Sequence, residues 1–246
     1  MKISTWNVNS VNARIEHLEK FIKKDQSDIY LLQELKTIED GFPKEIIKNA
    51  GYYSYVNGQK AWNGVAILSK EKLEITNTSI PKYDDPNARF IETEIQLKKI
   101  KKHIKLINIY LPNGNPIETE KFDYKIEWMK KFNKYIQELK NKNTPIIISG
   151  DFNVIPSDDD VYSPENFKND ACAHPLTREQ YRILINMGFT DLVKHFVEGK
   201  TNWTFWGYRG GGWQKGNGLR IDHFLTTANI TDLIKKVEVN REPRGW

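Results

Sequence analysis

Polar side chains follow four predicted strands at the points where the apolar runs end. Residues 28–33, 104–109 and 145–149 form short apolar runs rich in β-branched residues, which predicts buried strands, and residues 2–6 are a weaker strand candidate. The polar residues that follow them are Asn7 and Asn9, Glu34, Tyr110, and Asp151 and Asn153. Because α/β proteins often build their sites at one rim of a sheet, we expect these side chains to gather there.

The chemistry of these side chains fits a metal-assisted reaction. Glu34 and a nearby amide oxygen are hard ligands that suit Mg²⁺, which takes one or two carboxylates and keeps several waters. Asp151 with Asn153 can position and activate a water, and Tyr110 can donate to a phosphate oxygen. No Ser-His or Cys-His pairing stands out for nucleophilic catalysis, and there is no P-loop or dinucleotide fingerprint. Metal-assisted phosphodiester hydrolysis accounts for all four groups.

The elements that must position these residues alternate along the chain. Further strand candidates are residues 64–68, 72–77, 90–97, 222–226 and 234–239. Apolar residues at helical spacing predict helices over 13–24 and about 117–140, and a third helix over 177–187 is expected with Thr177 as its N-cap. With no Pro/Gly/Ser linker and no internal repeat, this order favours a single α/β domain over residues 1–246.

Composition excludes several classes of protein. The chain has 246 residues, 39% hydrophobic and 28% charged, which is ordinary for a globular protein and unlike a disordered or collagen-like chain. No apolar run approaches the roughly 20 residues that span a bilayer, and no secretion signal is evident at the N-terminus. The single cysteine, Cys172, excludes an intrachain disulfide and is interpreted as a small buried hydrophobe. We therefore expect a soluble cytoplasmic protein without a membrane partner.

Charge and aromatic residues suggest a polyanionic partner. The formal net charge is +5, and one basic run contains Lys98, Lys99, Lys101, Lys102 and Lys105. Such an excess suits nucleic acid, although a solvated lysine-rich surface explains it equally well.

The segment 207–218 holds six of the fifteen glycines and is predicted to be a mobile loop. The residues it displays that suit stacking or phosphate binding are Tyr208, Arg209, Trp213 and Lys215. By contrast, Trp6, Trp203 and Trp206 are interpreted as core residues.

Seven short blocks, in order, make the sequence recognisable. They are Trp6-Asn7-Val8-Asn9, Leu32-Gln33-Glu34-Leu35-Lys36, Trp62-Asn63-Gly64-Val65-Ala66-Ile67-Leu68-Ser69, Tyr110-Leu111-Pro112-Asn113-Gly114, Gly150-Asp151-Phe152-Asn153, Trp203-Thr204-Phe205-Trp206 and Gly218-Leu219-Arg220-Ile221-Asp222-His223. From the first residue to the last, the chain resembles the exonuclease III family of apurinic/apyrimidinic endonucleases. The resemblance implies an α/β fold of the DNase I-like type, a four-layer sandwich of two packed mixed β-sheets flanked by helices.

The resemblance also implies an activity. Members of this family are Mg²⁺-dependent enzymes (Mn²⁺ is the alternative ion) that cut double-stranded DNA on the 5′ side of abasic sites. Many also act at 3′ ends, as 3′-5′ exonucleases or 3′-phosphatases. An abasic nucleotide is easily extruded because no base must be unstacked, which is one physical source of selectivity. We expect a monomeric DNA-repair hydrolase.

Roles carry over from the family residue by residue. Glu34 would bind the metal with Asn7 beside it, and Asp151, supported by Asn153, would orient or deprotonate the attacking water. Tyr110 would contact the scissile phosphate. The remaining roles implied are DNA contacts by Arg89 and Asn113, a hydrogen bond that Asp222 accepts from the family's active-site histidine, and a wall for the extruded sugar formed by Phe205 and Leu219.

One departure from the family matters for activity. Relatives carry a Ser-Asp-His segment and a final core strand near the C-terminus, whereas this sequence contains no Ser-Asp-His and ends at Trp246. His223 follows Asp222 in a strand, so its side chain should point to the opposite face and substitute poorly. We therefore expect a truncated chain. If these 246 residues are the whole protein, cleavage should be strongly reduced, by about 10²–10³-fold for a lost charge-stabilising donor.

Two alternatives remain beside the repair hydrolase. The first is a catalytically weak module that binds abasic DNA without cutting it, which the absent histidine segment favours. The second is a phosphatase or nuclease of the same fold acting on another phosphoester, which the block from Gly218 to Asp222 makes less attractive. A cleavage assay at an abasic site distinguishes the first alternative from the repair hydrolase, and a substrate panel distinguishes the second from it.

Overall fold

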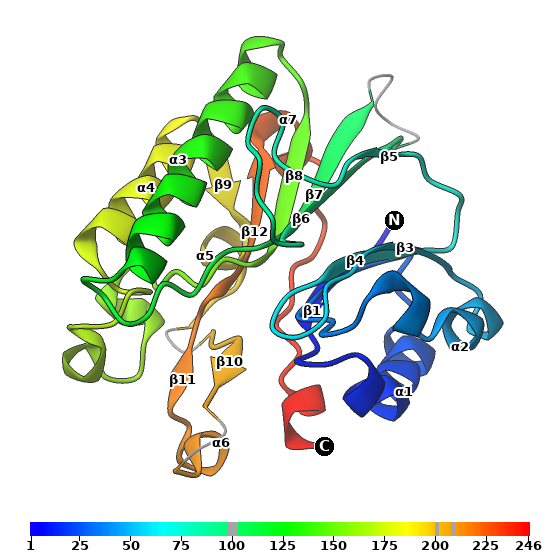
Figure 1. The fold of residues 1–246 in the computed structure, drawn as a ribbon, viewed down its shortest axis with the longest axis horizontal. Helices are drawn as coiled ribbons and strands as arrows, with labels where there is room; N and C mark the ends of the chain where they lie inside the picture. The colour runs from blue at the N-terminus through cyan, green and yellow to red at the C-terminus, as the bar shows by residue number, and fades with distance from the viewer. Residues whose placement is uncertain (98–102, 200–201, 208–209) are drawn as a thin grey trace. The chain divides into compact units, whose positions relative to one another are not determined.

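The computed structural model of the chain describes residues 1–97, 103–199, 202–207 and 210–246. They form two compact units (Figure 1). Unit 1 contains residues 1–110 and 144–151, and unit 2 contains residues 111–143 and 152–246. No helix in the described residues is long and apolar enough to cross a membrane.

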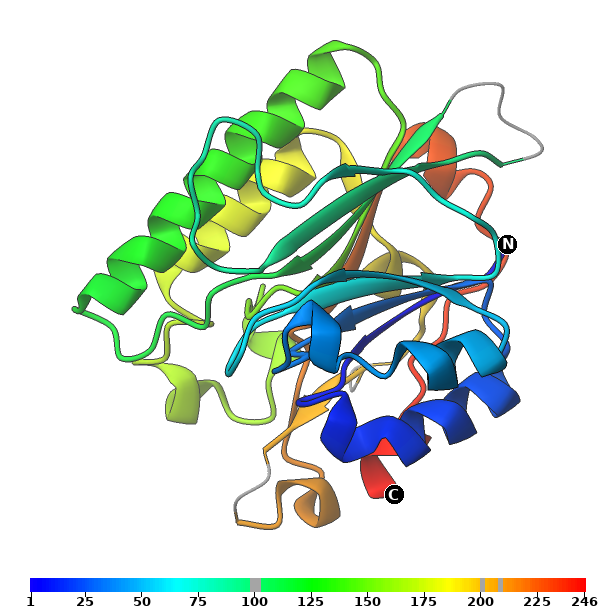
Figure 2. The same cartoon turned by 45° about the vertical axis from the view of Figure 1, so that its right-hand side comes forward.

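Unit 1 contains a four-stranded mixed sheet that holds the strands before Asn7 and Glu34. Its order is β1-β2-β4-β3, with β1 and β2 parallel and the other pairs antiparallel. Helices α1 and α2 lie on the same side of this sheet (Figure 2). The bounds are Ile3–Asn7 for β1, Ile29–Gln33 for β2, Tyr53–Asn57 for β3, Val65–Ser69 for β4, Ile15–Asp25 for α1 and Lys44–Asn49 for α2. Strand β2 is buried along its whole length, as its apolar sequence predicts.

The strands that precede Tyr110 and Asp151 pair in the second sheet of unit 1. Within this unit the order is β5-β6-β7-β8, and only β7 and β8 are parallel. The bounds are Ile75–Asn77 for β5, Phe90–Ile95 for β6, Ile104–Tyr110 for β7 and Ile146–Asp151 for β8. Buried amides join the two sheets, since Asn108 Nδ2 donates to Leu32 O (3.0 Å) and Ala66 O (2.9 Å). The expected pair of mixed sheets is therefore confirmed.

Unit 2 contains the long helix α3 (Glu120–Asn141) beside α4 (Pro175–Asn186), as both views show (Figures 1 and 2). Strands β9 and β12 pair antiparallel, and β10 and β11 form a short hairpin around α6. The bounds are Phe189–Asp191 for β9, Leu192–Phe196 for α5, Phe205–Trp206 for β10, Gly212–Lys215 for α6, Gly218–Leu219 for β11, Asp222–Thr227 for β12 and Ala228–Thr231 for α7. Single 3₁₀ turns occur in the two units at Asn12–Arg14, Glu39–Gly41, Asp158–Asp160, Pro164–Phe167 and Glu242–Gly245.

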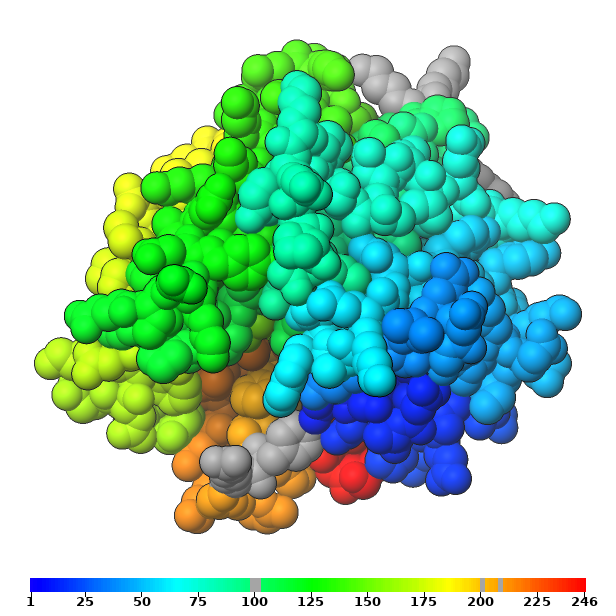
Figure 3. All heavy atoms as spheres, viewed as in Figure 1, coloured from blue at the N-terminus to red at the C-terminus, as the bar shows by residue number. Residues whose placement is uncertain are grey.

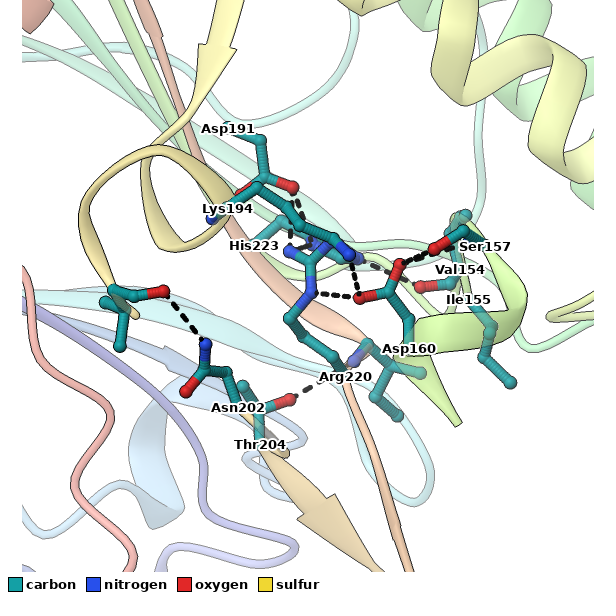
Figure 4. A network of polar contacts seen from close by, with 12 residues as sticks. Val154, Ile155, Ser157, Asp160, Asp191, Lys194, Asn202, Thr204, Arg220 and His223 are labelled. Carbon is teal, nitrogen blue, oxygen red and sulfur yellow. Dashed lines mark hydrogen bonds and ion pairs between the residues drawn. The ribbon is translucent and has the colours of Figure 1, made fainter. Parts of the chain in front are cut away.

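A buried charge network holds unit 2 together (Figure 4). Arg220 is 2% exposed and donates to Asp160 Oδ1 and Asp191 Oδ2, both at 2.7 Å. His223 lies beside it, with Nε2 at 2.9 Å from Val154 O. Burial, together with the Arg220 charge, lowers the pKa of His223 to about 4. His223 is therefore neutral at pH 7.

This buried histidine makes the protein sensitive to acid. Between its ordinary pKa of 6.5 and the folded value of about 4, the unfolded chain binds a proton that the folded chain does not. The free energy of unfolding should therefore fall by on the order of 3 kcal/mol as the pH drops through this window. The pKa values of Asp160 and Asp191 are lowered from 3.8, so their contributions are lost in a more acidic range, as the pH falls from about 3.8 through the folded values.

Urea unfolding at pH 7, 6 and 5 measures this loss. The variant His223→Gln is the control, because it has no titrating group at this position and should lose less stability over the same range. Equal losses in the two proteins would contradict the assignment to His223.

Three local predictions are wrong. Residues 234–239 form no strand, because these half-buried and exposed residues have no ladder partner in the described structure. Helix α4 begins earlier than expected, at Pro175, whose ring favours the first helical position, and His174 rather than Thr177 caps it. The segment 207–218 is not only a loop, because it contains α6 and the start of β11. Trp213 anchors this helix, because its ring packs edge-on against that of Trp206, with the ring centres 4.7 Å apart.

Candidate active site

The ends of β1, β2 and β8 bring three predicted site residues into direct contact in unit 1. The Asn7 side-chain nitrogen donates to Glu34 Oε1 and to Asp151 Oδ2, both at 2.8 Å. Asn7 Oδ1 accepts from the backbone N–H of Asn9 at 3.0 Å, which fixes the amide. The Asn7 Nδ2 atom therefore joins two carboxylates at the ends of strands from different sheets, and the predicted gathering is confirmed for Asn7, Glu34 and Asp151.

Tyr110 completes this cluster from the end of β7. Its hydroxyl donates to Glu34 Oε1 at 2.9 Å. Burial, and next the negative charges of Glu34 and Asp151, raise the pKa of Tyr110 well above its ordinary value of 10. Tyr110 is thus a neutral hydrogen-bond donor throughout the physiological pH range and is unsuited to act as a base.

Arg89 stands beside Tyr110. Its guanidinium lies 5.1 Å from the centre of the Tyr110 ring, and Nη1 donates to Tyr110 O at 3.2 Å. The two residues are also paired through the backbone, because Tyr110 N donates to Arg89 O at 2.8 Å. Arg89 therefore adds a positive charge next to the cluster, as its predicted phosphate-binding role requires.

Lys36 is a site residue that the sequence reasoning did not select. Its Nζ lies 3.0 Å from Glu34 Oε2 and also donates to Asn9 Oδ1. Glu34 and Lys36 both adopt left-handed backbone conformations (φ of 52° and 54°), which non-glycine residues seldom do. Backbone bonds from Leu35 N to Gly64 O and from Lys36 N to Asn63 O stabilise this turn. Strain of this kind is typical of functional sites.

Trp62 was also missed as a candidate. It is 74% exposed, and the loop between β3 and β4 that carries it forms part of the surface in Figure 3 (cyan). Lys36 Nζ lies 5.5 Å from the centre of its ring. The loop is anchored by the next residue, Asn63, whose Nδ2 donates to Gln59 Oε1 and Asn87 Oδ1, both at 3.0 Å. A large aromatic face is therefore displayed on a fixed loop beside Lys36.

In unit 2 the predicted residues Asn113 and Asn153 contact each other. Asn113 Nδ2 donates to Asn153 Oδ1 at 3.2 Å, and Asn153 Nδ2 donates to Leu111 O at 2.9 Å. Cys172 packs beside them and is 5% exposed, so the expected small buried residue is confirmed. Asn113 follows Tyr110 by three residues and Asn153 follows Asp151 by two, so the covalent chain links these amides to the carboxylate cluster.

The predicted DNA-contacting residues of the hairpin occupy different environments. Phe205 and Leu219 are directly paired between β10 and β11. Leu219 is buried among apolar residues and Phe205 packs against that cluster, whereas Lys215 is exposed on α6. Trp213 is half-buried against Trp206. Trp203 and Trp206 are buried core residues, as expected, and Trp6 is half-buried against Phe21.

Six of the predicted DNA-binding candidates belong to segments outside the described residues. Tyr208 and Arg209 lie outside the described residues, as do Lys98, Lys99, Lys101 and Lys102. Lys105, the last of that basic run, is paired with Glu92 and Glu94, both at 2.9 Å. Lys105 on β7 therefore forms ion pairs with two carboxylates of the neighbouring strand β6.

Asp222 and His223 follow each other at the start of β12. The Asp222 backbone N–H donates to Thr204 Oγ1 at 3.1 Å, and the residue is half-buried. His223 is 1% exposed and points into the Arg220 network. This buried position agrees with the expectation that His223 is a poor substitute for an active-site histidine, which stays a prediction.

The donor set in unit 1 suits a hard divalent ion. Glu34 and Asp151 supply carboxylate oxygens close to one amide, and Mg²⁺ binds through one or two carboxylates while keeping its waters. In the described part of the chain, no group of three or more His, Cys, Asp and Glu side chains could hold a metal.

Comparison with known proteins assigns the family. Residues 4–241 match the model of the Endonuclease/Exonuclease/phosphatase family. Exodeoxyribonuclease III of Haemophilus influenzae is 33% identical, over 94% of this chain and 90% of that protein. The exodeoxyribonuclease of Bacillus subtilis is 29% identical, over 100% and 95%.

Solved structures agree with this assignment. A 3′ phosphatase from Neisseria bound to a product DNA hairpin superposes with a TM-score of 0.93 at 32% identity, over 100% of this chain and 94% of that one. An AP endonuclease from Archaeoglobus fulgidus gives a TM-score of 0.87 at 32% identity, over 94% and 88%. The chain therefore belongs to the endonuclease/exonuclease/phosphatase family, and its similarity is to the DNA-repair nucleases within it.

Proposed function

We propose that the protein is a Mg²⁺-dependent phosphodiester hydrolase of DNA repair that cuts duplex DNA 5′ of abasic sites and also acts at 3′ ends. The observation that carries this proposal is the joining of Glu34 and Asp151 through Asn7, with the Tyr110 hydroxyl bound to Glu34. Two carboxylates with a neutral donor beside them provide a cation site, a base and a phosphate contact in one place.

Each residue of the cluster has a task in this reaction. Glu34 would hold the ion, with Asn7 fixing its carboxylate, and a bound Mg²⁺ supplies charge stabilisation for a phosphate oxygen. Asp151 orients a water and accepts its proton. Tyr110, kept protonated by burial and by the neighbouring carboxylates, donates to a phosphate oxygen. Asn153 supports Asp151. The resemblance gives Asp222 a bond to the family's active-site histidine, and because these 246 residues hold no Ser-Asp-His, no step is assigned to Asp222 here.

Duplex DNA is the proposed substrate. The positive net charge and Arg89 suit its phosphates. Asn113, Phe205, Leu219, Trp213, Lys215 and Arg209 are proposed DNA contacts. The family match extends over both units, which supports the prediction of one domain over residues 1–246. A monomeric state and a cytoplasmic location are also proposed, on the sequence alone.

A substrate panel tests the reaction class. The substrates are an abasic duplex, a recessed 3′ end, a 3′-phosphate end, an RNA duplex and inositol phosphates, each with Mg²⁺. We expect cleavage of the abasic duplex and release of nucleotides or phosphate from 3′ ends. Preference for RNA or inositol phosphates would favour another phosphoester hydrolase of the same fold, and binding of abasic DNA without cleavage would favour a binding module.

The exposed Trp62 makes a prediction about substrate binding. Stacking of a base on an aromatic ring is worth about 1–3 kcal/mol, so Trp62→Ala should raise KM for the abasic duplex roughly 5- to 150-fold. At saturating DNA, kcat should stay within about threefold of wild type, because Trp62 contacts no reacting group. Steady-state kinetics on both proteins measure the two constants.

Tyr53 is a matched control for this prediction. It is 45% exposed, with Lys72 Nζ at 5.9 Å from its ring centre, but it begins β3, whereas the Trp62 loop follows the end of that strand. Tyr53→Ala should leave KM unchanged. An unchanged KM in Trp62→Ala, or an equal rise in both variants, would rule out a specific contact at Trp62.

A further inference from the structure

Lys125 carries a charge into the interior of unit 2. It lies in the second turn of α3, and its side chain is fully buried (0% exposed). Lysine is almost never fully buried unless it is paired, because a buried ammonium loses its hydration. The position of Lys125 therefore demands strong acceptors around its Nζ atom.

Backbone carbonyl groups of two separate loops provide these acceptors. Lys125 Nζ donates to Asn153 O at 2.7 Å, to Pro112 O at 3.0 Å and to Asn113 O at 3.1 Å. Pro112 and Asn113 lie in the loop after β7, and Asn153 lies in the loop after β8. An ammonium group has three N–H donors and can satisfy three acceptors at once. One side chain thus ties together two loops that are distant in sequence.

These loops carry the side chains of Asn113 and Asn153, which contact each other at 3.2 Å. Asn153 has a left-handed backbone (φ of 48°). This conformation costs free energy and persists only where the surrounding structure fixes it. The approach of Lys125 is also close, because a Cβ atom at Gly114 would lie 2.5 Å from Lys125 Cδ. The ammonium therefore fixes the backbone from which both amides project.

We propose that Lys125 is a positioning residue of the hydrolase. By binding Pro112 O, Asn113 O and Asn153 O it sets the positions of the Asn113 and Asn153 amides, and with them the geometry in which Asn153 supports Asp151. This inference rests on the proposed function. It predicts that loss of the ammonium lowers kcat beyond what any loss of stability explains.

Kinetics of three variants test the proposal. Lys125→Met keeps the length of the side chain but removes the charge and the donors, and we expect kcat to fall about 10- to 100-fold, as for a small misplacement of catalytic groups. KM should stay within about threefold, because the binding residues remain. Lys125→Arg keeps a charged donor and should recover part of the lost kcat.

Asn133 on the same helix provides the structural control. It is also buried, and its Nδ2 donates to Gln180 O at 3.0 Å and to Gln180 Oε1 at 3.1 Å, so its contacts lie on α4. Asn133→Leu removes buried hydrogen bonds from α3 without touching the two loops. It should lower Tm but leave kcat within about threefold of wild type when assayed below its Tm.

The only cysteine of the chain gives a readout that does not depend on cleavage. Cys172 is 5% exposed, and its Sγ atom lies 3.8 Å from Asn113 Nδ2 and 4.0 Å from Asn153 Oδ1. If Lys125 fixes these loops, Lys125→Met should make Cys172 react about tenfold faster with a thiol reagent such as DTNB. Asn133→Leu should react at the wild-type rate.

The outcomes separate the two proposals. If wild type does not cleave DNA, the proposed function fails, while the thiol reaction still tests Lys125. A folded Lys125→Met with wild-type kcat or wild-type thiol reactivity would overturn the inference, as would an equal loss of kcat in Asn133→Leu. If Lys125→Met does not fold, Lys125→Arg decides: an intermediate kcat with faster thiol reaction supports the positioning role, and wild-type values of both overturn it.

Discussion

Asp151→Asn should lower kcat for an abasic duplex by about 10²–10⁴-fold, the range for loss of a general base. The substitution preserves the size of the side chain and an oxygen that can accept from Asn7. In the wild-type protein, Asn7 Nδ2 lies 2.8 Å from Asp151 Oδ2. It removes the negative charge and the capacity to take a proton from water. The fall should therefore appear in kcat, whereas KM should change little. Single-turnover kinetics with excess enzyme measure the chemical step directly.

Asp25→Asn is a matched control for this variant. Asp25 also lies in unit 1 and has little exposed side chain. It is bound by Ser27 and by Lys2 (Nζ at 2.7 Å), and Lys2 precedes the start of β1, whereas Asn7 is at the other end of that strand. Its removal should affect stability, because these contacts hold the pKa of Asp25 below its ordinary value. Activity of folded Asp25→Asn should stay within about threefold of wild type. A wild-type rate for Asp151→Asn would remove Asp151 from the proposed mechanism.

Tyr110→Phe should lower kcat by about 10²–10³-fold, as expected when one preorganised donor to a developing charge is lost. The ring and its contact with Arg89 remain, so only the hydroxyl that now donates to Glu34 disappears. Tyr52→Phe is the control, because Tyr52 is buried in the same unit but its hydroxyl donates to Ser27 O. It should cleave at nearly the wild-type rate.

The pH profile provides a second test of the tyrosine. Because burial and the charges of Glu34 and Asp151 raise the pKa of Tyr110 well above 10, the hydroxyl stays protonated in alkaline solution. The kcat of wild type should therefore show no fall that depends on Tyr110 up to about pH 10. An alkaline fall below that pH in wild type that is absent from Tyr110→Phe would show that the hydroxyl ionises and contradict its role as a neutral donor.

The central cluster could be predicted from sequence because each of its residues stands just after the apolar run of a strand. Asn7, Glu34, Tyr110 and Asp151 each follow an apolar run, and the ends of neighbouring strands meet in the folded sheets. The alternation of apolar and polar residues alone wrongly predicted a strand over 234–239, because these residues have no strand partner in the described residues. Alternation indicates an extended backbone, but a strand also needs a neighbour.

Lys36, Trp62 and Lys125 could not be predicted, because tertiary contacts and not local sequence patterns determine their positions. Lys36 and Trp62 are placed by left-handed turns and by backbone bonds between segments that are distant in sequence. Lys125 stands among polar residues in a helix that has many lysines, so its sequence does not distinguish it from a solvated one. Its burial depends on the carbonyl groups of Pro112, Asn113 and Asn153, which come together only through tertiary structure.

Metal-dependent hydrolysis at an abasic site can be measured with an end-labelled duplex that carries one abasic analogue, in Mg²⁺ and in EDTA. We expect a single nick on the 5′ side of the lesion in Mg²⁺ and none in EDTA. Binding in a gel shift without a nick would contradict hydrolysis and favour a module that only recognises abasic DNA. A nick of equal yield in EDTA would contradict the metal role proposed for Glu34 and its neighbours.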